Sequence, residues 1–80
     1  MPKKAPRRFP SDLPTEKVAR AFERLGFSFD HQGGRHTIYR DPKDSQRFVS
    51  LPRHSRTKRD LLRGILSGVG VSEQEFMAHY

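Results

Sequence analysis

A β-hairpin is predicted by residues 27–40, which read FSFDHQGGRHTIYR. Phe27 and Phe29 alternate with polar residues, as in a half-buried strand, and the residues after the turn are rich in β-forming types. Gly33 and Gly34 stand between the two runs, and glycines supply the positive φ angles that tight turns need. We therefore expect antiparallel strands over residues 27–32 and 35–40.

A third strand is predicted directly after this hairpin. Residues 41–44, which read DPKD, combine residue types that favour a turn. Residues 47–51 then form the expected strand, which Pro52 ends. Three consecutive strands with short connections predict an antiparallel sheet.

An amphipathic helix is predicted before the three strands. Its apolar stripe recurs at helical spacing and consists of Val18, Ala21, Phe22 and Leu25. The helix is expected to begin at Pro14 or Thr15. Gly26 suits the left-handed position just past its end.

A second helix is predicted after the strands, with its apolar stripe within residues 61–69. We expect Ser55 or Thr57 to cap its start, because a hydroxyl can accept from the first backbone amides of a helix. One of two glycines, Gly68 or Gly70, is expected to end it.

Residues 72–75, which read SEQE, have the spacing of a capping box and predict a short third helix anchored by Phe76. The expected order is therefore helix, three strands, helix and short helix. This order is typical of the α+β class, in which the apolar stripes of the helices pack on one face of an antiparallel sheet.

The composition limits the class of protein. A chain of 80 residues without cysteine is expected to fold as one domain, with neither disulfides nor a thiolate metal site. No apolar run approaches the roughly 20 residues that cross a bilayer, so we expect a cytoplasmic protein with no membrane partner. The formal net charge of +7 indicates an anionic partner, which is nucleic acid, an acidic protein or a lipid surface.

The basic charge is concentrated at the N-terminus. Residues 1–10 read MPKKAPRRFP, with no apolar period to bury. We expect residues 1–12 to form a flexible basic arm and residues 13–80 to form a single domain.

His36 is the main candidate for chemistry. It follows the glycine turn, where a strand end keeps side chains accessible, and imidazole can transfer protons near neutral pH. The alternative is a structural residue at the edge of the core, and spacing alone favours this alternative. His31 reads as an exposed strand residue and His79 as a terminal one, so neither is a candidate.

A second candidate region is the predicted basic loop over residues 53–58, which reads RHSRTK. His54 stands between cations, and it either binds phosphate beside Arg53 and Arg56 or is solvated. A further alternative is that His36 and His54 divide the base and acid roles. The cations continue through Lys58 into the second helix. Backbone amides at a helix start, together with nearby cations, form a natural phosphate site, but a solvated helix face is equally consistent with the pattern.

A metal site is not predicted, because the histidines lack the close spacings of a zinc site. The GxxxxGK loop of nucleotide hydrolases is also absent from the sequence. We therefore expect no cofactor.

Four stretches together suggest a family. They are residues 22–27 (FERLGF), 34–42 (GRHTIYRDP), 49–54 (VSLPRH) and 61–72 (LLRGILSGVGVS). In order and in spacing, they resemble the HicA family of toxins from bacterial and archaeal toxin–antitoxin systems.

This resemblance implies a double-stranded-RNA-binding-domain-like fold and the activity of an mRNA interferase, an endoribonuclease that needs no metal. The catalytic histidine of the family's glycine-serine-histidine motif corresponds to His36, and Arg35 stands where the family usually has serine. The resemblance also implies a HicB-like antitoxin as protein partner. The residues expected to hold the RNA phosphate are Arg35, Arg53, His54, Arg56 and Lys58. The alternative is a non-catalytic RNA- or protein-binding module on the same fold.

Overall fold

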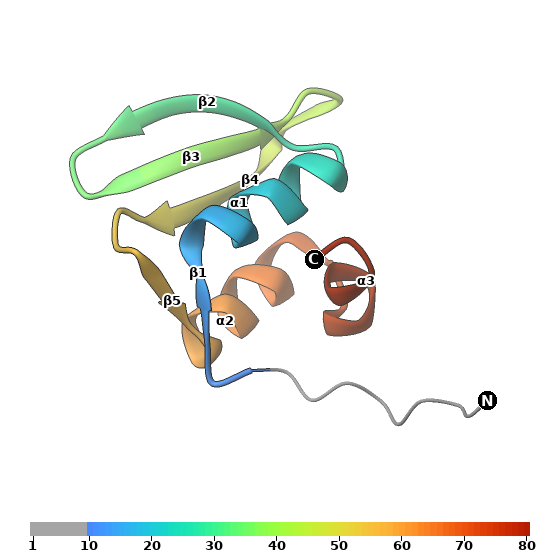
Figure 1. Cartoon of the computed structure of the whole chain (residues 1–80). Helices are drawn as coiled ribbons and strands as arrows, with labels where there is room; N and C mark the ends of the chain where they lie inside the picture. The colour runs from blue at the N-terminus through green and yellow to red at the C-terminus, as the bar shows by residue number, and fades with distance from the viewer. Residues whose placement is uncertain (1–9) are drawn as a thin grey trace.

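The computed structural model describes residues 10–80, so most of the arm predicted over residues 1–12 lies outside the described residues. Figure 1 shows the elements in chain order. They are β1 (Asp12–Pro14), α1 (Thr15–Arg24), β2 (Ser28–Gly33), β3 (His36–Asp41), β4 (Asp44–Pro52), β5 (Arg56–Lys58), α2 (Arg59–Val69) and α3 (Glu73–Ala78). The predicted α+β class is confirmed.

Strands β2, β3 and β4 form the predicted three-stranded antiparallel sheet, in that order. The hairpin turns at the expected glycines: Gly33 pairs with His36, and Gly34 has a φ of 55°, a value that glycine adopts without strain. β4 begins three residues earlier than predicted. The reason is the tightness of the second turn, in which Asp41 already pairs with Asp44.

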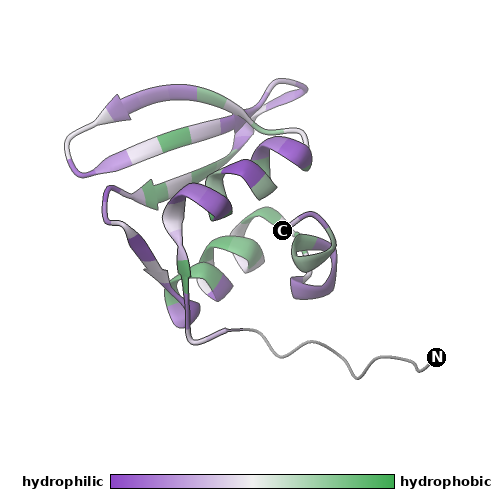
Figure 2. Cartoon of the chain, viewed as in Figure 1, coloured by the Kyte–Doolittle hydropathy of each residue, from purple (hydrophilic) through white to green (hydrophobic). Residues whose placement is uncertain are grey.

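The helices pack on one face of this sheet (Figure 1). Strand residues of that face, including Val49 and Leu51, pack with the predicted stripe of α1 and with most of the predicted stripe of α2. Leu61, which the apolar pattern places on the buried side of α2, is instead exposed. The Phe22 ring stands at the centre of the core, 5.6 Å from the Phe27 ring and 5.3 Å from the Phe76 ring, measured between centroids. Figure 2 shows α2 as the most apolar helix, in keeping with this packing. The arrangement is compatible with the fold that the resemblance implies.

Two short strands, β1 and β5, pair antiparallel in a separate ribbon that the sequence did not predict. Leu13 pairs with Thr57, and both are fully buried. Strands of three residues are too short to show an alternating pattern, and these two lie more than forty residues apart in the chain. The loop predicted over residues 53–58 is therefore partly a strand.

The predicted capping of α2 is wrong, and that of α3 is confirmed. The N-cap of α2 is Lys58, which makes no side-chain cap. Thr57, one residue earlier, does not cap the helix because its hydroxyl is buried and bonded to the Thr15 hydroxyl at 2.7 Å. Gly70 ends α2 with a φ of 74°. The Ser72 hydroxyl accepts from the Glu75 amide at 3.0 Å, as the capping-box spacing predicts. Within residues 10–80, no helix is long and apolar enough to cross a membrane.

Candidate functional site

The hairpin turn and the C-terminal end of β4 meet at one end of the sheet, which we call the hairpin end. There His36 pairs with Gly33 on β2 and with Pro52 on β4. Beyond this row, the Arg53 amide donates to the Arg35 carbonyl at 2.9 Å, and the Arg53 guanidinium donates to the Gly34 carbonyl at 3.0 Å. The structure therefore brings Arg35, His36 and Arg53 together, although Arg35 and Arg53 are 18 positions apart in the sequence.

His36 lies on the face of the sheet that points away from the helices, which we call the outer face. Thr37 and Tyr39 pair with the buried Leu51 and Val49, so the alternate residues His36 and Ile38 project from the opposite side. The His36 side chain is exposed, and no group within residues 10–80 hydrogen-bonds to its imidazole. It does not occupy the edge-of-core position, with one nitrogen satisfied, that the structural alternative describes.

Tyr39, on the helix-facing side of the same strand, behaves differently. Its ring is half-buried against the core and meets the Phe29 ring edge-on at 6.0 Å. Burial raises the pKa of the Tyr39 hydroxyl above its ordinary value. Tyr39 is therefore a packing residue of the sheet.

A shallow depression of about 350 Å³ lies at the hairpin end, lined by Gly34, Arg35, Arg53 and His54. The Arg35 guanidinium makes no ion pair within residues 10–80, and that of Arg53 is bonded to a carbonyl rather than to a carboxylate. Both retain an unneutralised charge. Guanidinium groups recognise phosphate through paired, charge-assisted hydrogen bonds, so this depression suits a phosphate group.

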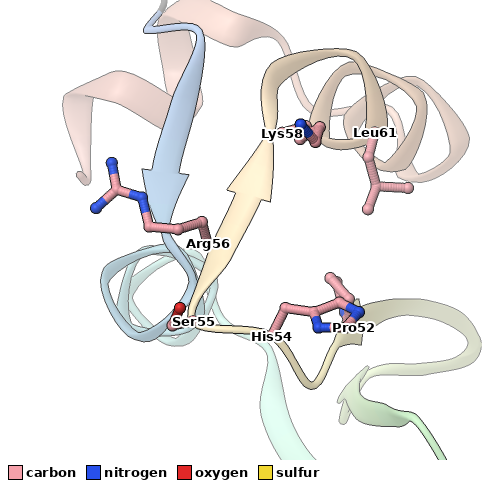
Figure 3. Close-up of a pocket in the computed structure, with 6 residues that line it drawn as sticks. All are labelled: Pro52, His54, Ser55, Arg56, Lys58 and Leu61. Carbon is pink, nitrogen blue, oxygen red and sulfur yellow. The ribbon is translucent and has the colours of Figure 1, made fainter.

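A second depression of about 400 Å³ adjoins the first. Its walls are mostly apolar, and its lining consists of Pro52, His54, Ser55, Arg56, Lys58 and Leu61. Figure 3 shows the Leu61 side chain pointing toward the His54 and Pro52 side, whereas the Arg56 guanidinium points away from His54. His54 is the residue that the two depressions share.

Arg56 stands apart from the other predicted phosphate ligands. Its guanidinium contacts the Asp12 carboxylate at 2.5 Å from Nη2 and 3.2 Å from Nε, and so it links β5 to β1. Lys58 lies on the same strand with its side chain exposed. The predicted set is thus divided: Arg35, Arg53 and His54 line the first depression, whereas Arg56 is paired with the Asp12 carboxylate.

A cluster that the sequence did not indicate lies on the outer face of β2. A β-bulge between Phe29 and His31 leaves Asp30 as an extra residue in the strand. The Asp30 carboxylate is 2.7 Å from His31 Nδ1 and 3.2 Å from the Arg40 guanidinium. The hydrogen bond from His31, reinforced by that from Arg40, lowers the pKa of Asp30 below its ordinary value. Strict alternation would place Asp30 and His31 on opposite faces, and no signal in the sequence locates the bulge.

The groups at the hairpin end can bind the anionic phosphate of a phosphodiester. An imidazole there can take a proton from, or give a proton to, an oxygen that reacts at this phosphate. The imidazole of His36 is exposed at the hairpin end, and the guanidinium groups of Arg35 and Arg53, which line the first depression there, can hold an anion. Among residues 10–80, no group of three or more His, Cys, Asp or Glu side chains is placed to hold a metal ion.

Comparison with known protein families identifies the family that the chain matches. A family model described as "HicA toxin of bacterial toxin-antitoxin" matches residues 15–71, a range that begins with α1 and ends just past α2. It therefore includes the hairpin end, both depressions and the Asp30 cluster. No curated protein matches the chain.

Proposed function

The chain belongs to the HicA toxin family, and on this premise we propose that it is an endoribonuclease that cleaves mRNA, with His36 as a catalytic residue. The observation that carries the proposal is the position of His36. Its imidazole is exposed and has no hydrogen-bond partner within residues 10–80. In the chain His36 follows Arg35, and it pairs with Pro52, the residue before Arg53. Neither arginine makes an ion pair with a carboxylate within residues 10–80. An imidazole so placed is open to a substrate.

The proposed reaction uses the 2′-hydroxyl of the RNA as its nucleophile. His36 either takes the proton from this hydroxyl or gives a proton to the departing 5′-oxygen, an effect worth about 10²–10⁴-fold in rate. Arg35 and Arg53 hold the phosphate and stabilise the charge that develops on it. The mechanism needs no metal, and a DNA strand, which lacks the 2′-hydroxyl, is not cleaved.

Arg35 occupies the position where the family usually has serine. Its carbonyl is fixed by the Arg53 amide, while its side chain remains exposed at the mouth of the depression. We assign to Arg35 the role of a phosphate ligand in place of the serine. His54 and Lys58 extend the same basic surface along the chain to the start of α2, and Arg56 contributes less because Asp12 offsets its charge.

The antitoxin partner follows from the family. HicA toxins pair with HicB antitoxins in toxin–antitoxin systems. For this chain, we propose a HicB-like protein that covers the hairpin end with an acidic surface, because the net charge of +7 favours such a partner.

The test is the His36→Ala variant, assayed for cleavage of a mixed mRNA and for binding of an RNA that carries 2′-O-methyl groups and so cannot be cleaved. We expect cleavage to fall at least about 100-fold, with binding and thermal unfolding unchanged. His79→Ala is the matched control. It removes the same kind of side chain outside the proposed site, since His79 lies at the C-terminal end of α3 and contacts the Glu75 carbonyl.

Two results would contradict this proposal. Cleavage that persists in His36→Ala removes His36 from the mechanism. RNA binding by the native protein without any cleavage favours the non-catalytic binding module instead.

A further inference from the structure

The position directly opposite His36 on β2 is held by Gly33, which has no side chain. The ring of His31 borders the position that a side chain at Gly33 would take. A Cβ atom added to Gly33 would lie 3.7 Å from His31 Cδ2 and 3.8 Å from His31 Nε2. The His31 ring is therefore turned along the strand, with its Nε2 edge over the residue that pairs with His36.

The register places both rings on the outer face. His31 pairs with Ile38, which shares a face with His36. His31 and His36 are consequently diagonal neighbours across two adjacent strands. Diagonal Cα atoms are about 7–8 Å apart, a span that long side chains bridge. Because the His31 side chain is directed toward Gly33, the residue that pairs with His36, its ring is closer to His36 than the Cα separation indicates.

Asp30 fixes the orientation of the His31 ring. Its carboxylate binds His31 Nδ1 at 2.7 Å, so Nε2 is the nitrogen left to exchange a proton with a ligand. Asp30 is itself held by Arg40, whose guanidinium also donates to the Ser45 carbonyl at 2.6 Å and lies over the Phe48 ring. The His31 side chain remains 57% exposed, and a substrate on the outer face can reach it.

We propose that His31 is a second proton-transfer residue of the site, acting together with His36 on one phosphodiester, and that Asp30 is its positioning residue. This inference rests on the ribonuclease function proposed above. In the reaction, the bond from O2′ to phosphorus forms while the bond from phosphorus to O5′ breaks. One imidazole takes the proton of the 2′-hydroxyl, and the other gives a proton to O5′. A single histidine cannot do both in one step, and His31 supplies the missing group.

The first experiment compares His31→Ala, His36→Ala and the control His79→Ala in single-turnover cleavage of an RNA whose cleavage site has been mapped. We expect His31→Ala to slow cleavage about 10²–10⁴-fold, with unchanged thermal unfolding and unchanged binding of the 2′-O-methyl RNA. Cleavage by His31→Ala at the native rate, with His36→Ala inactive, overturns the role of His31 and leaves the proposed function intact. Failure of the native protein to cleave RNA overturns the proposed function itself.

The second experiment tests the division of labour. The same RNA is made with sulfur in place of the 5′-oxygen at the cleavage site, a leaving group that needs no acid. Of His31→Ala and His36→Ala, the variant that has lost the general acid should regain most of its cleavage rate on this RNA. The variant that has lost the general base should stay slow. Rescue of both variants, or of neither, overturns the pairing.

The third experiment concerns Asp30. Asp30→Asn should slow cleavage in the native background and have no further effect in the His31→Ala background, because a positioning residue acts only through its partner. Equal slowing in both backgrounds overturns this role of Asp30.

Discussion

The two ends of the three-stranded sheet carry similar arginines in opposite states. At the end formed by the turn from β3 to β4, the Arg47 guanidinium is 3.1 Å from the Asp41 carboxylate and also donates to the Val69 carbonyl at 3.0 Å. At the hairpin end, neither Arg35 nor Arg53 makes an ion pair within residues 10–80, and Arg53 donates only to a backbone carbonyl. The arginine at the β3–β4 turn is therefore paired with a carboxylate, whereas the two arginines at the hairpin end are not.

This difference indicates two uses of the same residue type. Arg47 is bonded to the main chain of α2 and stacks over the Phe27 ring, so it joins the sheet to the helix layer. Arg53 is held in place by its carbonyl contact, but it keeps its full charge for a partner. A cation without a carboxylate contributes little to folding, and its field attracts polyanions.

The largest expected effect is on RNA affinity and comes from charge reversal at the hairpin end. In Arg35→Glu/Arg53→Glu, we expect the affinity for the 2′-O-methyl RNA at low salt to fall by about 100-fold, because two phosphate contacts become repulsive. The free energy of unfolding should change by less than about 1 kcal/mol, since both side chains are exposed. Fluorescence anisotropy and urea unfolding measure the two quantities.

A matched control for this variant is Arg20→Glu/Lys43→Glu, which makes the same change of net charge on α1 and in the turn before β4. It should reduce affinity much less. An equal loss in both variants would show that overall charge, rather than the hairpin end, governs binding.

At the end of the sheet formed by the β3–β4 turn, we expect substitution of the arginine to change the stability of the fold rather than RNA affinity. In Arg47→Ala, we expect the free energy of unfolding to fall by about 1–2 kcal/mol, because the bonds to Asp41 and to the Val69 carbonyl are lost together with packing on Phe27. RNA affinity should stay within about twofold of the native value. If Arg47→Ala left the free energy of unfolding unchanged and weakened RNA binding, the assignment of Arg47 to stability and of the hairpin end to RNA binding would be contradicted.

The smallest effect is expected on acidification. The Lys43 amide, reinforced by Arg47, lowers the pKa of Asp41 below its ordinary value of 3.8. A carboxyl group with a lowered folded-state pKa contributes stability that is fully present above its unfolded pKa and is lost as the pH falls through the folded one. Urea unfolding between pH 6 and pH 3 should therefore show a decline below about pH 4. Asp41→Asn should flatten part of this decline, and an unchanged decline in that variant would contradict the assignment.

Sequence reasoning succeeded where neighbours in the chain determine the structure. The glycine turn before His36, the apolar stripe around Phe22 and the capping box at Ser72 are short-range patterns, and the structure confirms each of them. It failed where the determining contact is distant. The pairing of Leu13 with Thr57 turned a predicted cap into a buried residue, and the bulge at Asp30 moved His31 into a cluster that alternation does not predict.

The sequence by itself determined the three helices, the three strands of the main sheet, their order and the placement of His36 at the start of a strand after a glycine turn. The reason is that hydrophobic period and turn chemistry act over a few residues. Only the tertiary structure decided which cations are paired with carboxylates and which histidines share a face of the sheet. Arg56 meets Asp12 and Arg53 meets Arg35 because of long-range strand pairing. The His31 ring is turned toward Gly33 within β2, after the bulge that sets the register. The contacts of Arg56 and Arg53 join residues far apart in the chain, and their distances are fixed only when the strands pair.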